Sequence, residues 1–407
     1  MEHNNTQTQS ALPIVTPKHP DDKVWDGSFL WVCTTFLIIL LMFSGLRMIT
    51  NIEWIRNLNP LILEFGFSFL SQIVIMAGVP FLSMWLFWRR KKTSRAGIGV
   101  LPNKPKILSS FGFDKPTWRV IGFAFLMGFL IYFFNIFVAG VFNGVLNIFG
   151  YRFPSGIGSP VGGVGGLFLS LFLIAVLPGI CEEVTHRGML MKSFSSKIGI
   201  MRAMLFSSVL FGFMHLNIVQ VFYAAILGYI IALAVVATRS LWVGIIMHFM
   251  NNALGTYFSI AGHYGWPGGN FLVWIMNLGG GIGVAIFIAL AIASYYIVMR
   301  IIHMFARENF YKNKTTTLAQ IAYTNPSVLK TKTGETMTLV QLDQRMEEGL
   351  QKMPRWFQTC FFLDPVYTTR RRMGERPTLT PAERTMFYGT MFLGGIITLF
   401  TLVWGLL

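Results

Sequence analysis

Residues 163–194 read GVGGLFLSLFLIAVLPGICEEVTHRGMLMKSF, and this stretch decides the class of fold. It carries no charged residue from Gly163 to Cys181 and then places two acids, Glu182 and Glu183, next to each other. A helix of about 20 predominantly apolar residues is long enough to cross a bilayer. The stretch therefore predicts a transmembrane helix that carries two carboxyl groups well inside its length.

Similar apolar stretches recur along the chain. Of its 407 residues, 54% are hydrophobic and 12% are charged, whereas soluble proteins carry roughly 25% charged residues. We therefore expect an all-α fold, a polytopic transmembrane helical bundle of about eight to nine spans. The predicted spans run approximately over Ser28 to Ile49, Pro60 to Trp88, Trp118 to Gly150, Gly163 to Phe194, Gly199 to Met214, Asn217 to Thr238, Leu241 to Gly262, Phe271 to Ile302 and Thr385 to Leu406. Those that begin at Pro60, Trp118, Gly163 and Phe271 are longer than one crossing needs, so tilts or breaks are expected there.

The excess of 33 Lys and Arg over 17 Asp and Glu lies mainly in alternate loops. The loop at residues 89–119 is rich in basic residues and holds one acid, Asp114. By the positive-inside rule this loop and the amino terminus face the cytoplasm. The excess of positive charge is thus explained by the orientation of the protein in the membrane. We expect a multi-pass protein of the cell membrane whose partner is the lipid bilayer, with no nucleic-acid partner.

Four regions follow from these patterns. An amphipathic helix is expected near Thr338 to Met353, inside a stretch of soluble composition. The division is a disordered cytoplasmic tail at 1–27, a transmembrane core at 28–302 with polar motifs in 163–262, a small cytoplasmic insert at 303–384, and a final transmembrane helix at 385–407.

Ionisable groups at membrane depth are costly and by default require a functional explanation. Only three acids fall inside predicted spans, and Glu64 is close enough to a helix end to reach the headgroups. Glu182 and Glu183 lie deeper. Arg187 follows Glu183 by four residues, on the same helix face, so we expect a Glu183–Arg187 ion pair that leaves Glu182 as the unpaired acid.

Pro178 stands one turn before these acids. A proline removes one helix hydrogen bond, and at membrane depth the freed carbonyl must be received by protein or by a water-filled cavity. The sequence therefore indicates a kinked helix with a cavity beside Glu182.

Two further polar pairs occur in later spans. Phe211 and His215 in FGFMH, and His248 and Asn252 in HFMNN, are each four residues apart and so share a helix face. Each cluster costs less to bury if all of them share one hydrated pocket. Counted from the helix ends, however, His248 lies about 10 Å deep while His215 falls near the far side of the membrane.

Such a pocket has the groups needed for water-mediated acyl hydrolysis. A carboxylate in a poorly solvated site is a general base for water, and a neutral imidazole can hold the same water. An amide and a second imidazole can donate hydrogen bonds to an oxyanion. In a membrane, this chemistry indicates cleavage of a peptide bond.

The order EExxxR, FxxxH and HxxxN in successive spans resembles the CAAX-protease and bacteriocin-processing family of intramembrane peptidases, also called the abortive-infection family. All seven signature positions are present: Glu182, Glu183, Arg187, Phe211, His215, His248 and Asn252. The resemblance implies that Glu182 activates water with His215, that His248 and Asn252 form the oxyanion site, and that Glu183 and Arg187 support them. It also implies a membrane-tethered peptide or protein substrate. His186 departs from the pattern, because the family often has an aromatic residue before the Arg.

Four other interpretations compete with this one, and the diiron interpretation among them fails. A zinc version of the peptidase would use His215, His248 and a Glu as ligands; no cofactor is favoured, and zinc is the possible one. A diiron site is suggested by Glu183 and His186 in ExxH spacing, but the second ExxH is missing. A transporter would explain the broken helix, although no inverted repeat is visible. The chain could also be a non-catalytic membrane scaffold or immunity protein.

Overall fold

The computed structural model describes residues 22–50, 52–94, 107–151, 162–279, 281–331, 333–366, 368 and 379–406. Within these ranges the regular structure is helical, apart from one isolated antiparallel bridge between Lys330 and Thr336. The all-α prediction is confirmed. Most of the predicted disordered tail, residues 1–21, lies outside the described residues.

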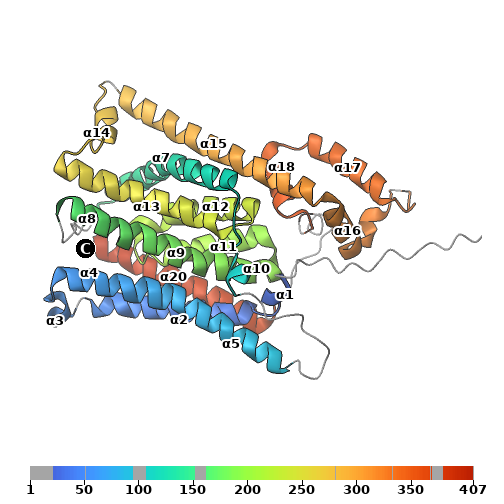
Figure 1. Cartoon of the computed structure of the whole chain (residues 1–407), viewed down its shortest axis with the longest axis horizontal. Coiled ribbons are helices and arrows are strands. Elements are labelled where there is room, and N and C mark those ends of the chain that lie inside the picture. The colour runs from blue at the N-terminus through green and yellow to red at the C-terminus, as the bar shows by residue number, and fades with distance from the viewer. Residues whose placement is uncertain are drawn as a thin grey trace, which may run out of the picture.

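Seven helical stretches of the described chain have the length and composition needed to cross a membrane, which confirms a polytopic bundle. They are α2 (Phe29–Ile49), the stretch Pro60–Arg90, α7 (Trp118–Ile148), the stretch Gly163–Ile198, α12 (Ile218–Thr238), α15 (Ile282–Lys312) and Pro381–Val403 within α20 (Pro381–Leu406). Figure 1 shows these long helices running side by side along the long axis of the molecule.

Three predicted spans differ from these seven. α11 (Ile200–Phe213) is apolar but only 14 residues long. α13 (Leu241–Tyr264) has 24 residues, yet the amide and imidazole side chains along it lower its hydropathy, and it is not among the seven. The predicted span Phe271–Ile302 consists of two helices, α14 (Phe271–Met276) and α15, which continues to Lys312.

Two of the four long stretches that were expected to tilt or break contain π-helical turns. Pro60–Ser94 consists of α4 (Pro60–Ser68), the π-helical η1 (Phe69–Gly78) and α5 (Val79–Ser94). Gly163–Ile198 consists of α8 (Gly163–Ser170), η2 (Leu171–Val176), α9 (Leu177–Glu183), η3 (Val184–Leu190) and α10 (Met191–Ile198), where η2 and η3 are π-helical. Such turns often occur at functional sites. α7, by contrast, is unbroken.

The insert forms helices that pack on the end of the bundle where α5 and α10 end (Figure 1). They are α16 (Lys314–Thr324), the 3₁₀-helix η4 (Pro326–Leu329), α17 (Leu339–Gln351) and α18 (Arg355–Leu363). Thr338 and Gln341 form a capping box at the start of α17, the predicted amphipathic helix. Asp364, after α18, accepts a hydrogen bond from the main-chain N–H of Ile200 (3.0 Å), so the insert caps the first turn of α11.

A helical hairpin around Gly199 determines how deep in the bundle the motifs of Glu182 and His215 lie. Gly199 has φ +81°, a conformation that favours glycine, and joins α10 to α11. Along the chain, His215 follows Gly199 by nearly as many residues as Glu182 precedes it. The two antiparallel arms therefore bring Glu182 and His215 to a similar depth, whereas the count along the sequence placed His215 near the far side of the membrane.

The start of α13 lies well inside this end of the bundle. The Leu241 N–H donates to the carbonyl of Gly112 (2.9 Å), and the neighbouring Phe111 packs directly on Gly188 of η3. α13 thus begins level with Gly188, not level with the α10–α11 hairpin. The sequence-based depth of His248 assumed a common surface for all helix ends and was wrong for this reason.

Candidate active site

Glu183 and Arg187 form the predicted ion pair. Nη1 of Arg187 lies 2.6 Å from Oε1 of Glu183, and both side chains are 0% exposed. The other guanidinium nitrogen, Nη2, donates to the carbonyl of Gly228 (2.7 Å), and the guanidinium carbon lies 4.7 Å from the centre of the Phe211 ring. The cation is thus held by a carboxylate, a carbonyl and an aromatic face.

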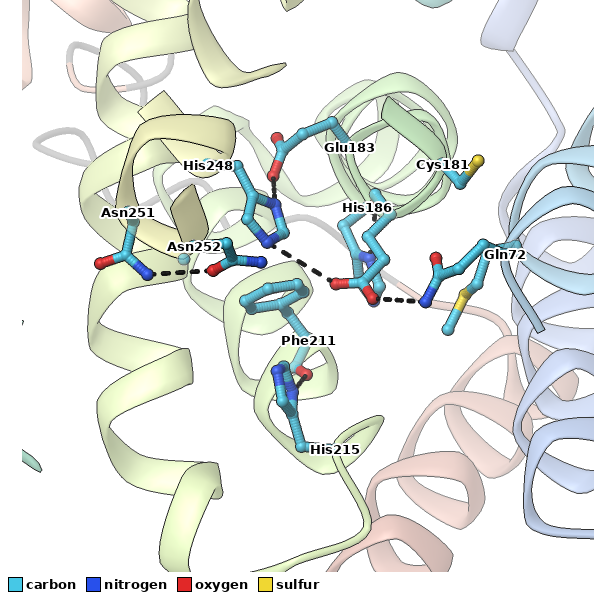
Figure 2. A network of polar contacts seen from close by, with 12 residues as sticks. Gln72, Cys181, Glu183, His186, Phe211, His215, His248, Asn251 and Asn252 are labelled. Atoms are coloured by element: carbon cyan, nitrogen blue, oxygen red, sulfur yellow. Dashed lines mark hydrogen bonds and ion pairs between the residues drawn. The ribbon is translucent and has the colours of Figure 1, made fainter. Parts of the chain in front are cut away.

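His248 lies between the two glutamates. Its Nδ1 is 3.0 Å from Oε1 of Glu183 (Figure 2), and its Nε2 is 3.9 Å from Oε2 of Glu182. Because Glu183 is paired with Arg187, it is an ionised carboxylate and can only accept a hydrogen bond. The hydrogen of a neutral His248 is therefore on Nδ1, and its Nε2 presents a lone pair to Glu182.

Glu182 has a partner that the motif analysis missed. Nε2 of Gln72, in η1, donates to Oε1 of Glu182 at 3.0 Å. The Glu182 side chain is 13% exposed, whereas that of Glu183 is 0% exposed. The two adjacent acids therefore occupy different environments: Glu183 is an enclosed member of an ion pair, and Glu182 is held by a neutral amide with one face open.

The ring of Phe211 is at the centre of three imidazoles. Its centroid lies 5.0 Å from that of His186, 5.1 Å from that of His215 and 5.6 Å from that of His248, each in an edge-to-face arrangement. Figure 2 shows His215 and His248 on either side of this ring. The predicted clusters from separate helices therefore do meet, and they meet around Phe211.

The other two imidazoles have the same tautomer as His248. Nδ1 of His215 is 3.0 Å from the carbonyl oxygen of Phe211, and Nδ1 of His186 is 2.9 Å from that of Glu182. A carbonyl oxygen only accepts, so both neutral rings carry their hydrogen on Nδ1. Nε2 is the acceptor in all three rings, and that of His186 is buried without a hydrogen-bond partner.

Asn252 binds a main-chain carbonyl one turn before Pro178. Its Nδ2 donates to the carbonyl of Ile174 (3.0 Å), four residues before Pro178. Asn251 in turn donates to Oδ1 of Asn252 (3.1 Å), and Asn135 of α7 donates to Asn251 (3.1 Å). This chain of amides fixes Asn252 and leaves its second Nδ2 hydrogen for another acceptor.

The zinc and diiron interpretations require side chains that converge on a metal ion. Among the described residues, no group of three or more His, Cys, Asp and Glu side chains is arranged to hold one. The Nδ1 hydrogens of His215 and His248 are engaged by a carbonyl and a carboxylate, which leaves both Nε2 atoms as acceptors. The reaction proposed for this site uses no metal, and a chelator distinguishes it from the zinc-dependent alternative.

Gly228 allows the close approach of α12 to this cluster, and its replacement by Ala tests the packing. A Cβ there would lie 2.9 Å from Nη2 of Arg187 and 2.9 Å from a ring carbon of Phe211. We expect Gly228→Ala to lower the free energy of unfolding by about 1 to 3 kcal/mol, measured by denaturation in detergent. Gly255→Ala is the matched control, because its Cβ would only touch Tyr132 at 3.7 Å. Equal stability of the two variants would contradict the described packing.

Comparison with known proteins agrees with the motifs. Residues 164–254 match the family model described as Type II CAAX prenyl endopeptidase Rce1-like. All seven signature residues fall within this range, so the family resemblance is confirmed for the region that contains the site. Searches of the curated proteins and of the solved structures gave no match.

Proposed function

We propose, with the match to the CAAX endopeptidase family as the premise, that this multi-pass membrane protein is an intramembrane endopeptidase in which Glu182 activates water. The substrates would be membrane-tethered peptides or proteins. The region of the match supports a CAAX-type peptidase, and the geometry around Glu182 supports the choice of base.

The observation that carries the proposal is the pair of acceptors formed by Oε2 of Glu182 and Nε2 of His248, 3.9 Å apart. This separation is too long for a direct hydrogen bond, but one water can lie about 2.8 Å from both atoms. Its two hydrogens then point at the two acceptors. The lone pair of the water oxygen is left free to attack a carbonyl carbon.

In the proposed reaction the water oxygen forms a bond to the carbonyl carbon while Glu182 takes one water proton. The carbonyl electrons move to the carbonyl oxygen and give a tetrahedral oxyanion. When the carbon–nitrogen bond breaks, Glu182 returns the proton to the leaving nitrogen. Such general acid–base catalysis contributes typically 10²- to 10⁴-fold to a rate.

The tautomers change the division of roles that the sequence suggested. A neutral His248 has no hydrogen on Nε2, so we propose that it holds the water rather than the oxyanion. His215 presents a second acceptor nitrogen on the other side of Phe211. Asn252, with one Nδ2 hydrogen still available, is proposed as the oxyanion donor.

The test is a cleavage assay in proteoliposomes that contain the purified chain and membrane-tethered peptide substrates, run in ¹⁸O-labelled water. We expect new carboxyl termini that contain one ¹⁸O atom, and the same rate after treatment with a chelator. Loss of cleavage on chelation, restored by zinc, would replace the glutamate mechanism by the metal-dependent one. No new termini from any tethered peptide would favour the scaffold interpretation.

A further inference from the structure

We infer that Gln72 is a positioning residue of the site: its carboxamide holds one oxygen of Glu182, so that the other oxygen faces His248. The inference rests on the proposed function, since Glu182 is the proposed base. Gln72 lies outside the three motifs and outside the matched range 164–254. It comes from the second span, which contributes no motif residue.

The hydrogen bond has a defined direction. A carboxylate oxygen only accepts, so the NH₂ group of Gln72 faces Oε1 of Glu182 at 3.0 Å. Gln72 is 8% exposed, and its own Oε1 is buried without a hydrogen-bond partner. An unpartnered buried acceptor costs free energy, and an apolar residue of similar size would not have this cost. Among the described residues, the side chain makes one hydrogen bond, and its partner is the proposed base.

A second contact fixes η1 against the helix that carries Glu182. The Thr185 hydroxyl donates to the main-chain carbonyl of Met76. Met76 follows Gln72 by four residues on η1, and Thr185 follows Glu182 by three, so the two contacts are in parallel register. The π-helical turns of η1 and η3 meet here, and Gln72 therefore approaches Glu182 from a fixed backbone position.

The groups around Glu182 show why a neutral donor is useful. On its own stretch of helix lie Glu183, His186 and Arg187, and His215 and His248 approach from α11 and α13. The guanidinium of Arg187 already forms an ion pair with Glu183. Gln72 stabilises the ionised carboxylate without adding a charge and without occupying Oε2, the oxygen that the water needs.

The test compares Gln72→Leu with Thr185→Val, a matched control that removes the hydrogen bond from Thr185 to Met76 between the same segments. Dicyclohexylcarbodiimide enters membranes and modifies protonated carboxyl groups, so the pH at which Glu182 is half labelled can be read by mass spectrometry. This readout does not require peptidase activity. In Gln72→Leu we expect the midpoint to rise by about one pH unit, a tenfold change in the protonation equilibrium, and the acid limb of the pH–rate profile to move by the same amount.

Thr185→Val should leave both pH values at those of the wild type, whatever its effect on stability. If Gln72→Leu loses activity but keeps both pH values, the role of Gln72 is structural and the inference is wrong. If the labelling midpoint shifts while the wild-type chain cleaves no peptide, the positioning role stands and the peptidase proposal fails. Gln72→Glu, which places a second carboxylate against Glu182, is expected to raise the midpoint further, and an unchanged midpoint would count against the inference.

Discussion

Glu182→Gln is expected to lower the rate of peptide cleavage by about 10³- to 10⁴-fold, near the upper end of what general acid–base catalysis supplies. Glutamine has nearly the same shape as glutamate, but its side chain cannot take a proton from water. Because Glu182 is partly exposed and is not a member of the buried ion pair, the exchange should leave the fold intact. Single-turnover cleavage in proteoliposomes measures the effect.

The control for this prediction is Glu64→Gln. Glu64 lies in the apolar stretch Pro60–Arg90, which precedes the motifs in the sequence. Glu64 lies in α4, none of whose residues is buried, and we expect its variant to cleave at the wild-type rate. A Glu182→Gln protein that folds and keeps more than about a tenth of the activity would contradict the role of Glu182 as base.

Arg187→Met is expected to destabilise the protein by about 3 to 5 kcal/mol, the usual cost of breaking a buried ion pair from one side. The loss leaves the fully buried Glu183 without its cation and removes the donor to the Gly228 carbonyl. Arg187→Lys should restore little of the lost stability. An ammonium group cannot contact both the Glu183 carboxylate and the Gly228 carbonyl and also lie flat on the Phe211 ring. Equilibrium unfolding in mixed micelles gives the free energies.

A double variant separates the charge from the packing. Glu183→Gln combined with Arg187→Met removes both charges, so it should recover a large part of the stability that Arg187→Met alone loses. It should still lack activity, because a neutral amide no longer fixes the Nδ1–H tautomer of His248 as strongly as a carboxylate does. If Arg187→Met costs less than about 1 kcal/mol, water reaches the pair and it is not enclosed as described.

The parts of the site that depend on local geometry could be predicted from the sequence. The Glu183–Arg187 pair, the bond from His215 to the Phe211 carbonyl, and the shared face of His248 and Asn252 are all relations between residues four apart on one helix. A helix imposes this spacing whatever surrounds it. The all-α bundle was likewise predictable, because composition alone requires a lipid environment for this chain.

The parts that depend on how helices are placed against one another could not be predicted. The level of α13 is set by its contact with Gly112, far away in the sequence, and the tautomer of His248 by Glu183 on another helix. Gln72 and Asn251 were not predicted, because they lie outside the EExxxR, FxxxH and HxxxN motifs on which the predicted site was built. Amide side chains at membrane depth were a usable signal, since they too must find partners there.

The three Nδ1-bonded imidazoles have a consequence for the charge that the site carries through the reaction. With these rings neutral, two carboxylates and one guanidinium leave the enclosed cluster with a single negative charge. In the proposed reaction, that charge leaves Glu182 when water attacks, appears on the substrate oxygen, and returns to Glu182 when the peptide bond breaks. In this scheme the site carries one net charge at each step. The negative charge moves between two positions, and each has a neutral amide beside it. Gln72 lies beside the proposed base, and Asn252 lies on the proposed oxyanion side.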